Sequence, residues 1–314
     1  MEACKHIFAV RMMIATKTCL KDEPKPKVFA SYAIPCDRCG SIRTMKYGRY
    51  GNRQVFYCKD CKHKFKQPLL VKARFTPETI TLCLDLYFSG LFLRKIARNM
   101  NDHFGLALDF STIYRWIQKY VPIISSYINS LAPQLSKTWH ADELVIRLRD
   151  GDVMQGGYNM GFIWNIMDRE TRYLIASKLT QKRDVHAAIA AFKEAAANAH
   201  GIAPDTVHTD SLRHYHSGVK VFPDTKRVEN CGIRKRHDNN NRVERLNGTL
   251  RERTKVQRGL KTVKTPIAEG QRIQYNFVKP HMALEGKTPG EVAGLGIKGW
   301  IELLGSALST KVEK

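Results

Sequence analysis

The chain has 314 residues, of which 43% are hydrophobic, and a formal net charge of +23. This length allows two or three domains with hydrophobic cores, and the large excess of positive charge indicates a polyanionic partner. No apolar run is long enough to span a bilayer, and no basic stretch carries a wide apolar face, so the sequence argues against a membrane protein.

The positive charge is concentrated in two regions. Residues 1–75 carry 17 basic and 5 acidic groups, and residues 233–264 carry 11 basic and 3 acidic groups. A surplus needed only for solubility would be spread more evenly, so both regions are expected to face phosphates. Arg11 interrupts the apolar N-terminal stretch, and no clear cleavage site follows, so no signal peptide is expected. We therefore expect a cytoplasmic, nucleoid-associated protein.

Residues 1–30 are expected to form a flexible leader, and residues 31–68 a zinc ribbon. The ribbon prediction rests on two Cys-x2-Cys pairs with 18 residues between them, a spacing typical of a tetrahedral Zn²⁺ site. Disulfides are improbable where thiols stay reduced, and iron is a remote alternative with the same ligands. The predicted ligands are Cys36, Cys39, Cys58 and Cys61.

Two short strands, Ser41–Tyr47 and Arg53–Cys58, are expected around this site, with Gly48–Asn52 as the turn between them. Basic and aromatic side chains interleave along both strands, which indicates a module that contacts DNA. A purely structural ribbon with a charged surface is the alternative. The arginines predicted to contact DNA from the ribbon are Arg43, Arg49 and Arg53.

Residues 76–133 show helical periodicity and are predicted to form a helix-turn-helix DNA-binding domain. Thr76 is expected to cap the first helix, Ser89-Gly90 to end it, and Ser111 to cap the third. Arg115 on the third helix would then face a DNA groove. Residues 76–136 carry only one more basic than acidic group, so a plain helical linker is nearly as well supported.

Residues 137–283 are predicted to form a mixed α/β domain, followed by a C-terminal tail over residues 284–314. The expected order is three antiparallel strands, a helix, a strand, a helix, a strand and a long closing helix. Arg149–Asp152 is expected to be a turn after the first strand. The main elements are expected at Trp139–Leu148, Gly161–Met167, Tyr173–Leu179, Asp184–His200, Thr206–Thr209, Lys226–Glu229 and Asn240–Arg258.

Three carboxylates occupy positions from which they can converge. Asp142 lies within the first strand, Asp210 follows the fourth, and Glu244 lies on the closing helix. Carboxylates with water and phosphate oxygens suit Mg²⁺, and paired ions of this kind support phosphodiester chemistry. Arg251 and Lys255 share the helical face of Glu244 and are expected to position DNA phosphates. The alternative is that Glu244 forms an ordinary ion pair on a solvated basic helix.

Three neighbouring side chains compete for a role at this site. Glu143 adjoins Asp142, so strand alternation should send it to the opposite face, where it would be a surface or supporting group. His140 and His208 each precede a candidate aspartate by two residues and share its face. A hydrogen-bonded histidine beside a polar site is a better-supported expectation for both than a metal ligand.

The segments Trp139–Glu143, Thr209-Asp210 and Asn241–Arg245 resemble the three acidic motifs of insertion-sequence DDE transposases. The resemblance is strongest to the insertion-sequence-six group, in its archaeal zinc-ribbon form. It covers roughly residues 36–295, including a closing motif at Thr288–Gly294. This resemblance implies a ribonuclease H-like catalytic fold behind the ribbon and the helix-turn-helix.

The resemblance also implies roles for single residues. Asp142 would bridge two Mg²⁺ (or Mn²⁺) ions, and Asp210 and Glu244 would each hold one. Arg251 occupies a position where lysine is commoner in the family. The implied activity is DNA cleavage and strand transfer at terminal inverted repeats, followed by joining to target DNA, by a homodimer or higher oligomer. A non-catalytic DNA-binding derivative and a structure-selective nuclease of the same fold are the alternatives.

Overall fold

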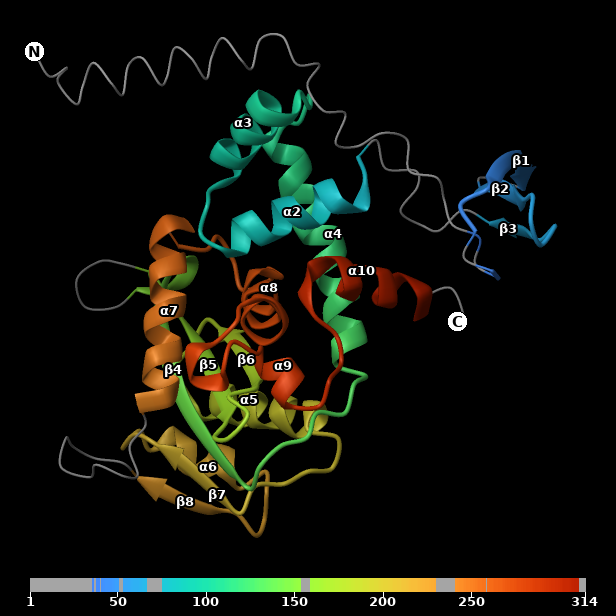
Figure 1. Cartoon of the computed structure of the whole chain (residues 1–314). Helices are drawn as coiled ribbons and strands as arrows, with labels where there is room; N and C mark the ends of the chain where they lie inside the picture. The colour runs from blue at the N-terminus through green and yellow to red at the C-terminus, as the bar shows by residue number, and fades with distance from the viewer. Residues whose placement is uncertain are drawn as a thin grey trace, which may run out of the picture. The chain divides into compact units, whose positions relative to one another are not determined.

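The structure is a computed structural model (Figure 1). The chain forms two compact units, one made of residues 1–76 and 97–108 and the other of residues 77–96 and 109–314. The predicted leader, residues 1–30, lies outside the described residues. The predicted domain boundaries stay predictions. The structure describes residues 36, 38–39, 41–50, 53–66, 75–153, 159–229, 241–257 and 259–310.

The cysteine segment forms a three-stranded antiparallel sheet in the order β1-β2-β3, with β1 at Thr44–Tyr50, β2 at Arg53–Cys58 and β3 at Lys64–Lys66. The predicted turn at Gly48–Asn52 is wrong in its first part, because β1 continues through Tyr50. The register between β1 and β2 shifts between Lys46 and Gly48. Such a shift marks a β-bulge, which a glycine accommodates inside a strand.

The predicted helices of the next segment are present as α2 (Pro77–Phe88), α3 (Leu93–Phe104) and α4 (Phe110–Ile128). The expected cap at Ser111 is wrong. Asp109 is the N-cap of α4, and its carboxylate accepts a hydrogen bond of 2.8 Å from the Ser111 backbone N–H. That these helices form a DNA-binding helix-turn-helix stays a prediction.

The central sheet has five strands in the order β6-β5-β4-β7-β8. β4 pairs antiparallel with β5, which pairs antiparallel with β6, whereas β4 with β7 and β7 with β8 are parallel. This order and these directions are those of the ribonuclease H-like fold, which confirms the predicted fold class. The strands are β4 at Thr138–Val153, β5 at Asn159–Asp168, β6 at Leu174–Thr180, β7 at Thr206–Thr209 and β8 at Lys226–Glu229.

The predicted turn at Arg149–Asp152 is wrong, because β4 continues through it to Val153. The Arg149 N–H donates to the Leu260 carbonyl at 2.9 Å, and the Leu260 N–H donates to the Arg147 carbonyl at 2.8 Å. A segment more than a hundred positions away therefore extends this strand. The local Asp and Gly signals favour a turn, but the long-range pairing prevails.

Helices cover both faces of this sheet (Figure 1). α5, capped by the Asp184 carboxylate, and α6 pack on one face, and α7 packs on the other. Among the described helices, none has the length and apolarity needed to cross a bilayer. The remaining elements are α5 (Val185–Asn198), α6 (His214–Val219), α7 (Asn241–Gln257), α8 (Ile267–Ile273), η1 (Gln274–Val278), η2 (Met282–Leu284), α9 (Pro289–Val292) and α10 (Gly299–Thr310).

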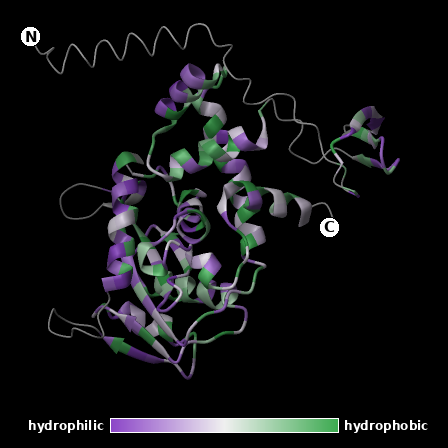
Figure 2. Ribbon diagram, in the orientation of Figure 1, coloured by the Kyte–Doolittle hydropathy of each residue, from purple (hydrophilic) through white to green (hydrophobic). Residues whose placement is uncertain are grey.

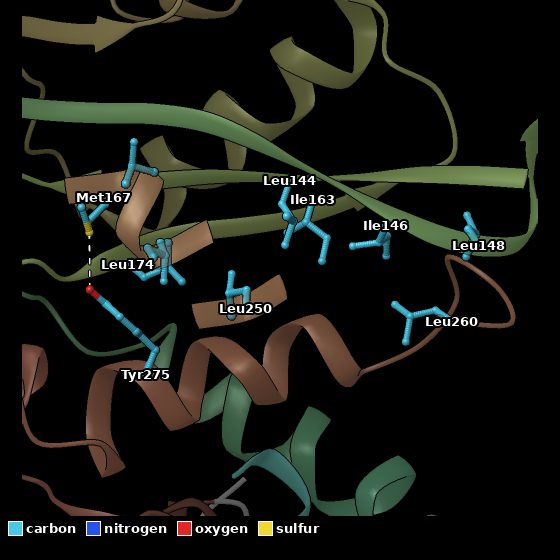
Figure 3. Close-up of a cluster of buried hydrophobic side chains, with 11 residues drawn as sticks. Leu144, Ile146, Leu148, Ile163, Met167, Leu174, Leu250, Leu260 and Tyr275 are labelled. Carbon is cyan, nitrogen blue, oxygen red and sulfur yellow. Dashed lines mark hydrogen bonds between the residues drawn. The ribbon is translucent and has the colours of Figure 1, made fainter. Parts of the chain in front are cut away.

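The core between the sheet and α7 fixes the rotation of that helix. Figure 2 shows hydrophilic and hydrophobic residues interspersed along α7. Its apolar face lies inward, since Val243, Leu246 and Leu250 are buried in one cluster with residues of β4 that include Leu144 and Ile146. Figure 3 shows Leu250 in this cluster with Leu144 and Ile146. Burying each such side chain stabilises the fold by about 1.5–3 kcal/mol. The opposite face of α7 is thereby presented outward.

Candidate metal centre

The pairing of β4 with β7 brings two of the predicted acids to one level of the sheet. The two strands are in register at His140 and His208, whose buried rings stack with centroids 5.1 Å apart. Asp142 and Asp210 each follow two residues later. Each aspartate has a carboxylate oxygen within 4.8 Å of the other, and an oxygen of Glu143 lies in the same group. Asp142 and Asp210 therefore converge as expected.

Glu143 is held from the opposite side of the sheet. Its side chain is only 4% exposed, so the expectation of a surface position is wrong. One of its carboxylate oxygens pairs with Arg183, and the other accepts a 2.6 Å hydrogen bond from the Tyr215 hydroxyl. Burial, followed by the negative charge of Glu143, raises the pKa of Tyr215 well above its usual value. Both oxygens of Glu143 therefore already have donors within the protein.

Asp142 and Asp210 lack a comparable cationic partner. Within the described residues, neither aspartate forms an ion pair with lysine or arginine. Burial and the negative charge of Glu143, with a smaller contribution from Asp210, raise the pKa of Asp142 to about 7. Two neighbouring carboxylates that are not ion-paired to lysine or arginine in the described residues, such as those of Asp142 and Asp210, are a suitable donor set for a divalent ion.

This pKa predicts an unusual effect of Asp142→Asn on the metal-free protein. The folded-state pKa lies above the unfolded value of about 3.9, so the carboxylate lowers stability progressively as pH rises between these values. The amide removes this charge. We expect roughly 1–3 kcal/mol of added stability at about pH 8 and little gain at about pH 4. Thermal unfolding without added divalent metal at the two pH values measures it. Equal gains at both would show that the charge is not the cause.

A buried amide connects α7 to Asp142. The Asn247 side-chain amide donates to the Asp142 carboxylate at 2.8 Å, and its oxygen accepts from the Asn165 amide at 2.7 Å. The Ser177 hydroxyl donates to the Asn165 oxygen at 2.9 Å. These hydrogen bonds fix one carboxylate oxygen of Asp142 and the position of α7 relative to the sheet. The sequence did not reveal this contact, because it depends on the packing of α7.

Glu244 is exposed in the first turn of α7, three residues before Asn247. Residues at this spacing share a helix face, so Glu244 lies one turn from the amide that binds Asp142. Among the described residues, the acids grouped within 4.8 Å are Asp142, Glu143 and Asp210, and Glu244 is not one of them. Its role in holding a metal therefore stays a prediction. Arg251 and Lys255 are exposed further along α7.

The four predicted zinc ligands gather in the small sheet. Each has its sulfur within 4.8 Å of the other three, with Sγ–Sγ distances of 3.5 Å between Cys36 and Cys61 and 3.6 Å between Cys39 and Cys58. A regular tetrahedron with Zn–S bonds of about 2.3 Å has edges of about 3.8 Å. None of these four cysteines forms a disulfide. Backbone N–H groups, led by that of Cys61, lower the pKa of Cys58 to about 7, which favours its thiolate. Burial and the neighbouring thiols raise the pKa of Cys61 to about 12 in the absence of metal.

The arginines predicted to contact DNA occupy the following positions. Arg43 is exposed and pairs with Asp60 at 3.2 Å, an interaction that solvent weakens. Arg49 is exposed on β1, and the Arg53 backbone begins β2. Arg115 is exposed on α4, where its guanidinium donates to its own helix. Contact between these arginines and DNA stays a prediction.

Comparisons with known proteins give one family match and several structural similarities. A family model described as a DDE domain matches residues 136–275. A comparison with curated proteins finds no match. The HTLV-2 integrase catalytic core domain in complex with magnesium, in its dimeric form, is similar with a TM-score of 0.36 and 14% identity over 52% of this chain and 98% of that chain.

Two larger assemblies also contain similar chains. One is the simian T-cell lymphotropic virus intasome in complex with PP2A regulatory subunit B56 gamma, with a TM-score of 0.37 and 12% identity over 68% of this chain and 74% of that chain. The other is the Drosophila P element transposase strand transfer complex, with a TM-score of 0.32 and 11% identity over 48% of this chain and 36% of that chain.

Proposed function

Residues 136–275 are a DDE domain of the insertion-sequence transposase family, and on this basis we propose that the chain cleaves and joins DNA at terminal inverted repeats. The observation that carries the proposal is the meeting of Asp142 and Asp210 across β4 and β7, with no lysine or arginine in the described residues ion-paired to either carboxylate. This pair has the chemistry of a divalent-metal site.

The proposed roles of the acids follow the family resemblance. Asp142, Asp210 and Glu244 would hold the metal ions. When bound, Mg²⁺ or Mn²⁺ supplies the Lewis acid that activates water and then a DNA 3′-hydroxyl for in-line attack. Asn247 orients one oxygen of Asp142. Arg251 and Lys255, exposed on α7, would hold the phosphate backbone of the DNA.

The zinc ribbon and the helices that follow it would recognise the terminal repeats of the insertion sequence. We propose that the four cysteines bind one Zn²⁺, which their tetrahedral spacing supports. The ribbon arginines and Arg115 on α4 would then contact the terminal repeat. Joining requires two ends in one complex, so the active form would be a homodimer or a higher oligomer. The net charge of +23 favours such binding to DNA.

The function is tested by comparing DNA substrates with the purified full chain and Mn²⁺. We expect 3′-end cleavage and joining on duplexes that carry the inverted repeats flanking the coding region, and none on duplexes with a scrambled repeat. Binding to both duplexes should weaken steeply with salt.

Branched DNA without repeats separates the alternatives. Cutting of branched DNA with no joining of repeats would favour a structure-selective nuclease. Tight repeat binding with no cleavage under any metal would favour a non-catalytic DNA-binding protein.

A further inference from the structure

Arg227 on β8 encloses the turn that carries Asp210. Its Nε donates to the Thr209 hydroxyl at 2.9 Å, and one terminal nitrogen donates to the carbonyls of Asp210 at 2.9 Å and Leu212 at 3.0 Å. The other terminal nitrogen pairs with Glu229 at 2.9 Å. Only 11% of the Arg227 side chain is exposed. All edges of one guanidinium are therefore used on a single turn and one carboxylate.

The turn also has bonds of its own. The Thr209 hydroxyl donates to the Asp210 carbonyl at 2.8 Å, and the Leu212 N–H donates to the Asp210 carboxylate at 2.9 Å. The second bond sets the direction of the carboxylate relative to the turn. These two hydrogen bonds lie within the turn, so they do not fix its position relative to β4.

The strand pairing of β7 does not fix the position of Asp210 directly. Its pairing with β4 ends at His208, and its pairing with β8 ends at Thr209, so Asp210 lies beyond the last ladder pair on both sides. Arg227 pairs with Val207 within the parallel ladder and reaches forward from there to the turn. It therefore connects the rigid sheet to the backbone that carries the acid.

We propose that Arg227 is a positioning residue that holds Asp210 at metal-sharing distance from Asp142. The proposal rests on the proposed function of that acid pair. Arginine suits this position because its planar fork presents fixed donors to three acceptors at once, whereas the compact ammonium of lysine cannot reach them in the same geometry. Outer groups of this kind typically change metal affinity about 10–100-fold when they are removed.

The test measures Mn²⁺ affinity in the full chain by calorimetric titration, with the zinc already bound. Arg227→Lys and Arg227→Gln are each expected to weaken Mn²⁺ binding roughly 10–100-fold. End joining should need proportionally more Mn²⁺, while kcat at saturating Mn²⁺ should stay within about threefold of wild type. Glu229→Gln is the matched control, because it removes the ion pair and keeps the three bonds to the turn. It should leave Mn²⁺ affinity within about twofold.

A role limited to folding predicts a different pattern. Both arginine variants would then unfold at lower temperature but bind Mn²⁺ as tightly as wild type, and this result overturns the proposal. If both fail to fold, Thr209→Val supplies the measurement, because it removes one bond to Arg227 and one to Asp210. Unchanged Mn²⁺ affinity in that variant also overturns it. Wild-type chain that binds Mn²⁺ but joins no ends would instead contradict the proposed function and leave the positioning role intact.

Discussion

Glu244→Gln is expected to reduce end joining by at least about 1,000-fold, equivalent to about 4 kcal/mol of lost transition-state stabilisation. The same loss is expected for Asp142→Asn and Asp210→Asn. Each substitution replaces a proposed anionic metal ligand with a neutral amide of nearly the same shape. Binding to terminal-repeat DNA should stay within about twofold of wild type, because the basic residues proposed to contact phosphates are unchanged. Joining assays and salt-matched binding titrations measure the two effects.

Variants of Glu143 and Glu252, compared with Glu244→Gln, decide which glutamate is the third acid of the proposed metal site. Glu252 is exposed on α7, as Glu244 is, and Glu252→Gln should join ends as well as wild type. Glu143→Gln breaks the ion pair with Arg183, so it should cost stability of roughly 1–3 kcal/mol and reduce joining far less than Glu244→Gln. Abolished joining in Glu143→Gln with normal joining in Glu244→Gln would assign the third position to Glu143.

Removal of zinc is expected to unfold the small sheet of residues 36–66. Structural zinc contributes about 10–16 kcal/mol of apparent binding free energy in small zinc domains, and that binding energy is folding energy. The buried core of this sheet supports the same conclusion, since it consists of two cysteines with Phe56 and Phe65. Purified protein should hold about one zinc per chain. Elemental analysis and hydrogen exchange of β1–β3 before and after chelation measure these outcomes.

Cysteine variants separate this site from other effects. Cys58→Ser should lose the zinc, the protection of β1–β3 and most of the affinity for terminal-repeat DNA. Cys83→Ser, at a buried cysteine of α2 outside the four-cysteine group, should keep the zinc. A zinc-free wild type with normal protection of β1–β3, or a Cys58→Ser protein that binds DNA normally, would remove the zinc ribbon from the proposal.

The sequence predicts the features that depend on local pattern. Alternating and helical periodicity placed all five strands of the central sheet and the helix α7. The spacing of the cysteines predicted a site whose sulfurs do gather. These features are carried by residues close together in the chain, so their pattern is visible without the fold.

The features that the sequence did not predict depend on distant partners. β4 continues through Asp150 because the segment at Leu260 pairs with it. Glu143 is buried because Arg183 and Tyr215 bind it from the other face of the sheet. A strand pattern gives the face of a side chain, but it does not give the groups that arrive there from elsewhere.

The parallel pairing of β4 with β7 has a consequence for the order in which the protein folds. β4, β5 and β6 are neighbours in the chain, so their pairing closes short loops. The pairing of β4 with β7 closes a loop that contains β5, β6 and α5, at an additional entropic cost of roughly 2 kcal/mol relative to a tight turn. Asp142 and Asp210 meet only after this distant pairing. A chain still emerging from the ribosome therefore holds one acid without the other, so the proposed metal site cannot form before β7 has paired with β4.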